Sequence, residues 1–455
     1  MTTVVERFAD WAVAFRAQPL APEVLHHARR AVIDLHAAMF SGAREAPAAL
    51  LEKALAEELD RGEARLALGR RATVRAAALI NGAAAHTTEV DDIFRDGIYH
   101  PGAPTIPAAL ALAQSLGASG EAFLRAVIVG YEISTRIGAA MGRAHYKYWH
   151  NTGTIGCFGA CAAAAELLGL DAKRFAHALA TVTTFSAGLQ QSFRRDSMSK
   201  PLHAGRAAEA GVLAALAAAK GVTGVHDMLE GEVGFGAAMS ASPDWSKATK
   251  GLGADYNITH VTFKNHGCCG HTFPSLDAVI ELRNKHKLAA KDIARVRIAT
   301  YQGGLDVVDN YKPEGDYQAK FSLPYVVAHA LIHGSVRLNA FGPDRLNDPQ
   351  LRALMAKVEL SADPELSRSF PRQRAARVEI ETTDGRKLSH FQETRKGDPE
   401  MPLTDSELND KYVELVAPVL GDAGARALLK ELWSLETLKN VEFDHAARPA
   451  VRAAG

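Results

Sequence analysis

Cysteine is scarce in this sequence. The chain has 455 residues and four cysteines, of which Cys157 and Cys161 lie four residues apart and Cys268 and Cys269 are adjacent. No C-x-x-C pair occurs. A disulfide framework, a structural zinc site and an iron–sulfur cluster each need several suitably spaced ligands, so we expect none of the three.

The sequence also lacks a charge excess and a long apolar run. Its 52 basic and 52 acidic residues give a formal net charge of zero, which argues against nucleic acid or an anionic membrane as the main partner. No run of about eighteen apolar residues occurs. The first residues, "MTTVVERFADWAVAF", mix charges into an amphipathic pattern. We therefore expect no membrane span, no signal peptide and a cytoplasmic location.

Nucleotide and acyl-transfer motifs are missing as well. The sequence contains no Walker A motif, no Rossmann G-x-G-x-x-G and no G-x-S-x-G elbow. These motifs hold phosphates or present a nucleophilic serine, so their absence argues against those two chemistries.

What the sequence does contain is a large amount of alanine-rich helix. Residues 1–250 are dominated by good helix formers with apolar positions three and four apart, as in "APEVLHHARRAVIDLHAAMF" and "GEAFLRAVIVGYEISTRIGAAM". Near residue 255 the pattern changes, because 294–301 and 375–393 alternate apolar and polar residues. The second of these carries Asp384-Gly385, a hairpin-turn signal. Helical patterns return near residue 404.

We therefore predict a mainly α protein. An all-helical domain is expected over residues 1–260 plus 400–455, and a smaller α+β lid domain over 261–399.

Four segments concentrate polar residues between these elements. They are "HTTEVDDIFRDGIYHPG" (86–102), "RAHYKYWHNTGTIG" (143–156), "RRDSMSKPLHAGRAA" (194–208) and "FKNHGCCGHTFP" (263–274). Each segment also has an explanation other than catalysis. In the order given, these are a solvated loop, an aromatic helix end packed on a neighbour, and a loop before a helix. The fourth segment could be a metal site, but its ligands would crowd one another. Loops on a rigid scaffold commonly carry function, which favours considering the four together.

Together these segments supply cationic and imidazole groups with few carboxylates. Such a set suits a small di- or tricarboxylate, because lysine and histidine neutralise its charge while one unprotonated base removes a proton next to a carboxylate. The candidate catalytic residues are His100, Tyr146, His150, Lys200 and Lys264. The candidate substrate-binding residues are Asp91, Asp92, His203, His266, Cys269 and His271.

At these segments the sequence resembles the MmgE/PrpD family, which includes 2-methylcitrate dehydratase, cis-aconitate decarboxylase and iminodisuccinate epimerase. The similarity extends through most of the chain, in blocks such as "GYEISTRIG", "HNTGTIGCFGACAAAAELLGLD", "MSKPLHAGRAAEAGVLAALAAAKGVTG" and "AKFSLPYVVAHAL". It implies a helical domain and an α+β lid with the active site between them, a homodimer, and catalysis without metal or organic cofactor.

The resemblance also assigns positions. The family's acidic and histidine positions correspond to Asp91, Asp92, His100 and His150, and its "K-P-x-H-x-G" block to Lys200 and His203. Its lid lysine corresponds to Lys264, a catalytic histidine of the decarboxylase to Cys269, and a lid tyrosine to a position near Tyr311.

Three positions depart from the family pattern. Ile93 stands where threonine is usual, Gly270 where arginine is frequent and Phe273 where histidine is frequent. The loss of a cation and an imidazole suggests a substrate that differs from cis-aconitate in charge or shape.

Three functions follow from these patterns. We expect a cofactor-independent lyase in which His100 or His150 handles the proton and Lys200 and Lys264 hold carboxylates; a buried lysine is an alternative base. A second hypothesis is an epimerase or racemase with two bases, for which Tyr146 and Lys200 are candidates. A third is a non-catalytic carboxylate-binding relative.

Overall fold

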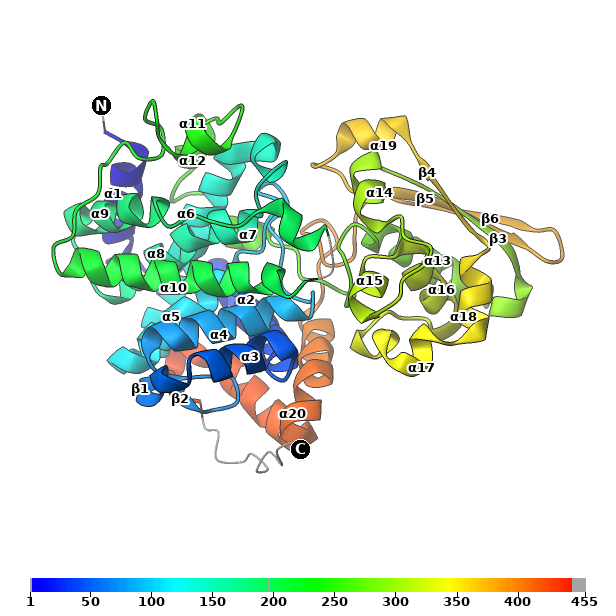
Figure 1. The fold of residues 1–455 in the computed structure, drawn as a ribbon, viewed down its shortest axis with the longest axis horizontal. Coiled ribbons are helices and arrows are strands. Elements are labelled where there is room, and N and C mark those ends of the chain that lie inside the picture. Colours follow the sequence, from blue (N-terminus) through cyan, green and yellow to red (C-terminus); the bar gives the residue numbers. More distant parts are fainter. Residues whose placement is uncertain (1, 195–196, 444–455) are drawn as a thin grey trace. The chain divides into compact units, whose positions relative to one another are not determined.

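The computed structural model describes residues 2–194 and 197–443 (Figure 1). It confirms the mainly α class expected from the sequence. The chain forms two compact units. Within the described residues, the larger consists of 2–87, Asp91–Val261 and the segment that starts at Thr404; the smaller consists of Thr88–Val90 and Thr262–Leu403. Residues 444–455, which the expected helical domain includes, lie outside the described residues.

The larger unit is built from helices. They are α1 (Val4–Phe15), α2 (Pro22–Gly42), α3 (Ala46–Ala54), α4 (Val74–Thr87), α5 (Gly102–Leu116), α6 (Gly120–Tyr146), α7 (Asn151–Thr154), α8 (Gly156–Leu167), α9 (Ala172–Thr183), α10 (Ser199–Ala219), α11 (Phe235–Met239), α12 (Ser246–Thr249) and α20 (Asp405–Trp433). The label α20 covers two helical segments separated by a kink at Gly421, whose backbone is not helical and has a positive φ. None of the helices described in either unit is both long and apolar enough to cross a bilayer.

A short antiparallel pair interrupts this helical unit. Strands β1 (Leu59–Arg65) and β2 (Arg71–Ala72) pair with an irregular register. The sequence pattern did not predict them, because most of β1 is exposed and carries charged residues rather than alternating apolar ones.

Helices α4 and α10 cross with their backbones in contact. A Cβ placed on Gly82 would lie 2.9 Å from Cα of Gly205, and a Cβ placed on Gly205 would overlap the carbonyl oxygen of Leu79. Glycine is needed at both positions because any side chain would separate the helices. In Figure 1, α10 runs along α4, and it also packs against α8. This crossing holds the C-terminal end of α4 beside the N-terminal end of α10.

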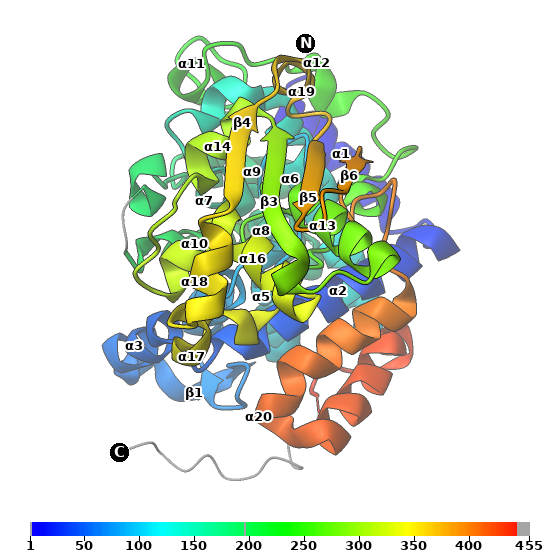
Figure 2. The same ribbon diagram turned by 90° about the vertical axis from the view of Figure 1, so that its right-hand side faces the viewer.

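The smaller unit contains a four-stranded sheet. Its strands are β3 (Ile293–Thr300), β4 (Val358–Ala362), β5 (Ala376–Thr382) and β6 (Lys387–Gln392), in the order β4-β3-β5-β6 that Figure 2 shows. Only β3 and β4 are parallel. Gly385 is left-handed in the turn between β5 and β6, which confirms the hairpin expected there.

The helices of the smaller unit are α13 (Phe273–His286), α14 (Gln302–Val308), α15 (Asp316–Lys320), α16 (Leu323–His333), α17 (Pro343–Leu346), α18 (Pro349–Met355) and α19 (Pro364–Ser369). Of these, α13, α14 and α16 pack against the strands of the sheet. Alternate residues of β3, Val296 and Ile298, are buried in one core with residues of α13 and α16. The period-two pattern seen in the sequence is therefore the core-facing side of the sheet.

The glycine crossing gives a first prediction. Gly205→Ala should destabilise the larger unit by about 2 kcal/mol or more, because the new methyl group forces α10 away from α4. The midpoint of thermal unfolding measures the loss. Gly315→Ala is the control, since a Cβ at Gly315 meets no atom within 4 Å and its φ is not positive. Equal midpoints for the two variants would show that the crossing is not tightly packed.

Candidate functional site

The first polar segment forms a folded loop between α4 and α5. His86 lies in the last turn of α4, and the following residues run to His100, just before α5. Phe94 and Tyr99 pair across the loop, with N···O distances of 2.8 and 3.3 Å. The Asn151 side chain donates to the carbonyl of Gly97 at 2.7 Å. Most of the loop is buried, so it is a rigid structure and not the solvated loop that a charge-rich segment usually forms.

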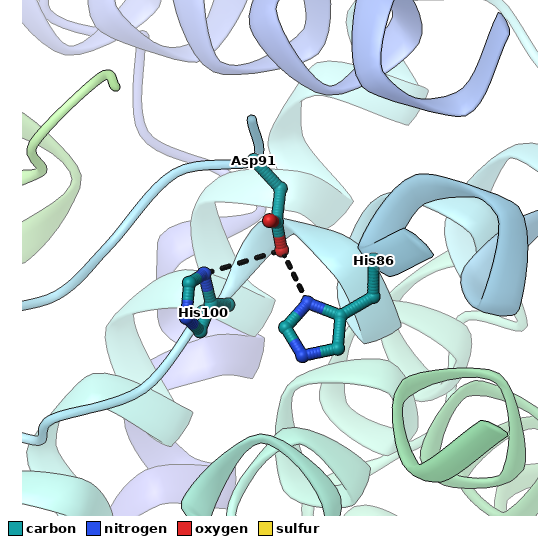
Figure 3. A group of neighbouring side chains, drawn as sticks. All are labelled: His86, Asp91 and His100. Atoms are coloured by element: carbon teal, nitrogen blue, oxygen red, sulfur yellow. Dashed lines mark hydrogen bonds and ion pairs between the residues drawn. The ribbon is translucent and has the colours of Figure 1, made fainter. Parts of the chain in front are cut away.

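Asp91 joins two histidines. Figure 3 shows its carboxylate between the two imidazole rings: Oδ2 lies 2.7 Å from Nδ1 of His86 and 3.2 Å from Nδ1 of His100. Burial alone would raise the pKa of Asp91, but the rings of His100 and His86 hold it well below its usual value. The ionised carboxylate accepts a hydrogen bond from His86, so it favours a proton on Nδ1 of that ring.

Asp92, the next residue, has a different environment. Its Oδ1 accepts a hydrogen bond from the backbone N–H of Gly102 at 3.0 Å, and its Oδ2 accepts one from the Tyr131 hydroxyl at 2.7 Å. Burial, followed by the negative charge of Asp34, raises the pKa of Asp92 to about 8. Its contacts hold the start of α5, two residues after His100. The substrate-binding role expected for Asp92 stays a prediction.

His150 and His203 form a second pair. Their Nδ1 atoms lie 2.9 Å apart, and the His150 ring also packs edge-on against Phe193. Burial lowers the pKa of both residues, that of His203 to about 4, and the nearby His86 and Lys200 lower them further. Both rings are therefore neutral at neutral pH.

Lys200 lies in the first turn of α10, where it is buried. Its Nζ stands over the Phe193 ring, 5.7 Å from the ring centre. A buried ammonium close to two neutral imidazoles is a good ligand for a carboxylate, because the protein places a positive charge there without a proton on either ring.

These residues form one group, which we call the histidine cluster: His86, Asp91, His100, His150, Lys200 and His203. The ring centre of His86 lies 4.7 Å from that of His100 and 5.4 Å from that of His150. Five of the six members were expected from the sequence. His86 was not among the candidates, because a single histidine near a helix end gives no local sign of its partner.

Tyr146 was also expected to be catalytic. It ends α6, is half-buried, and its backbone carbonyl accepts a hydrogen bond from the Gln190 side chain at 2.6 Å. The neighbouring His145 is fully engaged, with Nδ1 2.9 Å from the Met239 carbonyl and Nε2 2.7 Å from the Thr154 hydroxyl. The catalytic role of Tyr146 stays a prediction.

The other expected residues lie in the smaller unit. Nζ of Lys264 donates to the backbone carbonyl of Glu89 at 2.9 Å and lies 3.2 Å from its Oε2. Nε2 of His266 lies 2.8 Å from Oδ1 of Asp277. Glu89 has a left-handed backbone, and the candidate set did not include it, although it stands two residues before Asp91.

The remaining candidates of this unit surround a buried tyrosine. Nδ1 of His271 lies 2.9 Å from the Tyr301 hydroxyl, and burial raises the pKa of that hydroxyl to about 12. Cys269 is buried, whereas Tyr311 is exposed and donates to the Val358 carbonyl. The substrate-binding roles expected for Cys269 and His271 stay predictions.

The two departures at 270 and 273 share one neighbour. The Arg395 guanidinium donates to the Gly270 carbonyl at 3.2 Å and stands 5.9 Å from the centre of the Phe273 ring. It is fully buried and paired with Asp398. Arg395 therefore places a cation beside Gly270 and Phe273, but Asp398 neutralises its charge.

One group of described side chains has the donor atoms of a metal site. His86, Asp91 and His100 each present a ligand atom, and all three atoms lie within 4.8 Å of one another. Two imidazoles and a carboxylate are ligands that zinc accepts. A hydrogen bond from His86 at 2.7 Å and an ion-pair contact with His100 at 3.2 Å account for the arrangement without an ion.

Several known proteins are similar to this chain over most of its length. A cis-aconitate decarboxylase-like protein of Aspergillus oryzae is 26% identical over 464 residues, which cover 96% of this chain and 95% of that protein. Human cis-aconitate decarboxylase is 29% identical over 377 residues, 80% of this chain and 77% of its own. Cis-aconitate decarboxylase of Aspergillus terreus is 25% identical over 463 residues, 96% and 94% of the two chains.

Two family models also match. The MmgE/PrpD N-terminal domain matches residues 6–248, and the MmgE/PrpD C-terminal domain matches residues 266–436. The first match contains the whole histidine cluster, and the two together account for most of the sequence, so the chain belongs to the MmgE/PrpD family.

Proposed function

We propose that this protein is a lyase of the dehydratase or decarboxylase type that acts on a small citrate- or aconitate-like polycarboxylate. It would need neither a metal nor an organic cofactor. The observation that carries the proposal is the histidine cluster, in which neutral imidazoles and a buried lysine lie together.

Dehydration and decarboxylation both require a proton to move at a carbon next to a carboxylate. A neutral histidine is a suitable proton acceptor for this step, and His150 and His100 are the two candidates. Negative charge then develops on the carboxylate as an enediolate, and a fixed cation stabilises that charge most. We assign this role to Lys200, whose ammonium is buried near His150.

The names of the relatives support the same reaction class. All three relatives above are named for cis-aconitate decarboxylation or likeness to it, and two of them match over more than nine-tenths of both chains. At identities of 25–29% these names support a tricarboxylate as the substrate class, and we propose an unsaturated or hydroxylated one. As part of the same proposal, Lys264 and its neighbours bind further carboxylates of the substrate.

Product analysis in deuterated water tests the reaction. Purified protein is incubated with cis-aconitate, citrate, 2-methylcitrate and an iminodisuccinate-type acid, and proton NMR follows each mixture. We expect loss of carbon dioxide or water from one of the tricarboxylates. Deuterium exchange without either loss would support the epimerase alternative instead, and no exchange or turnover with any acid would contradict both.

Lys200 gives the next prediction. Lys200→Ala should lower kcat/KM about 10²-fold or more, since it removes the cation that stabilises the developing charge. Lys220→Ala is the matched control, because Lys220 is the exposed C-cap of the same helix. Steady-state kinetics on the substrate identified above measures both. Equal kcat/KM for Lys200→Ala and the wild type would remove Lys200 from the site.

Asp92 predicts a pH dependence of substrate binding. With its pKa raised to about 8, Asp92 is neutral at neutral pH and gains a negative charge as the pH rises through that value. The new charge lies beside Asp91 and repels an anionic substrate, so KM should rise between about pH 7 and about pH 9. Asp92→Asn, which does not ionise, should keep KM constant over this range.

The control for this experiment is Asp96→Asn. Asp96 is exposed in the same loop, so its variant should retain the rise in KM of the wild type. A rise of equal size in Asp92→Asn would show that another group titrates.

A further inference from the structure

The contact between His150 and His203 joins two nitrogens of the same kind. Their Nδ1 atoms are 2.9 Å apart, which is a hydrogen-bond distance, so one nitrogen carries the proton and the other offers a lone pair. Which one carries it decides the chemistry of His150. A proton on Nδ1 of His150 leaves Nε2 able to accept a proton, whereas a proton on Nε2 makes that nitrogen a donor only.

The 2.9 Å separation of the two Nδ1 atoms requires a single proton between them, and both rings are neutral. His150 is only 3% exposed, and a positive imidazolium there would lie close to the ammonium of Lys200. Burial and this cation lower the pKa of both histidines. Two positively charged rings, which would place an N–H on each Nδ1, are therefore excluded at neutral pH.

The backbone fixes the two rings against each other. The N–H of His150 donates to the Gly188 carbonyl at 2.9 Å, and its own carbonyl accepts from the N–H of Gly153 at 2.9 Å. A Cβ on Gly188 would come within 3.1 Å of Nδ1 of His203, and a Cβ on Gly153 within 3.1 Å of Cβ of His203. Two glycines thus let the chain close around His203, so the Nδ1 contact is held by the fold.

The surroundings of the rings give the direction of the hydrogen bond. His203 is half-buried, and a neutral histidine in contact with water prefers to carry its proton on Nε2. Nδ1 of His203 is then the acceptor, and Nδ1 of His150 is the donor. No hydrogen bond engages Nε2 of His150 within the described part of the chain.

We propose that His203 is a positioning residue: it accepts the Nδ1 proton of His150 and so keeps the lone pair of His150 on Nε2, where it serves as the proton acceptor. This inference rests on the proposed function for its catalytic meaning, and it changes the role expected for His203 from substrate ligand to partner of His150. His203 thereby does for His150 what Asp91 does for His86.

Two variants of His203 test the role, His203→Asn and His203→Gln. An asparagine side chain at this position places its amide oxygen near the position of Nδ1, whereas a glutamine side chain places its amide near the position of Nε2. Nitrogen-15 NMR of histidine-labelled protein reports which ring nitrogen carries the proton, and a His150→Asn sample identifies the His150 signals among the 18 histidines.

We expect the wild type and His203→Asn to show an unprotonated Nε2 on His150. His203→Gln should shift His150 toward the Nε2-protonated form and lower kcat about tenfold or more with little change in KM. The control is His177→Gln, because Nδ1 of His177 makes the same kind of contact, 3.0 Å from Nε2 of His226, outside the cluster. It should leave the His150 signals and kcat unchanged.

The NMR result is independent of any substrate. An Nε2-protonated His150 in the wild type overturns the inference, as does an unchanged His150 tautomer in His203→Gln. Absence of turnover with every acid tested would instead overturn the proposed function, while the tautomer data would still decide the partnership of the two histidines. The wild-type spectrum alone gives this decision if a variant does not fold.

Discussion

The contacts of Asp91 with two imidazoles are the interaction on which the rest of the candidate site depends. Oδ2 of this buried carboxylate accepts a hydrogen bond from His86 at 2.7 Å and makes an ion-pair contact with His100 at 3.2 Å. A carboxylate taken out of water is costly unless it is paired, so the fold has to bring both rings to it. Helix α4 supplies His86, and the folded loop between α4 and α5, closed by the Phe94–Tyr99 pair, supplies His100. The geometry of the site therefore depends on the folded conformation of this loop.

Two neighbouring aspartates show how much the fold adds to the sequence. Asp91 faces imidazole rings and stays ionised, whereas Asp92 faces a tyrosine hydroxyl and a second carboxylate and holds its proton to about pH 8. Nothing in the letters "DD" distinguishes them, because the difference arises from groups distant in the chain such as Tyr131 and Asp34. For the same reason the sequence pointed to Asp91 and to His100 but not to His86.

Local patterns were sufficient for most of the secondary structure. Helical spacing predicted α6 and α10, and the Asp384-Gly385 turn predicted the β5–β6 hairpin, because these signals act between residues close in sequence. The β1–β2 pair was missed since its exposed, charged strands carry no apolar alternation. Pairings such as His150 with His203 were out of reach of any local pattern, because 53 residues separate the partners.

The glycine crossing of α4 and α10 has a consequence for protein engineering. Gly82 precedes His86 by one helical turn, and Gly205 follows His203 by two residues, so the same backbone contact sets the spacing of both histidines. The site cannot be enlarged for a bulkier acid at these two positions, because glycine has no side chain to shorten. The adjustable positions lie opposite, in the Gln190–Phe193 turn that meets α10, where Phe193 contacts His150 and Lys200. Substrate range should therefore be redesigned through this turn, with the helix pair left intact.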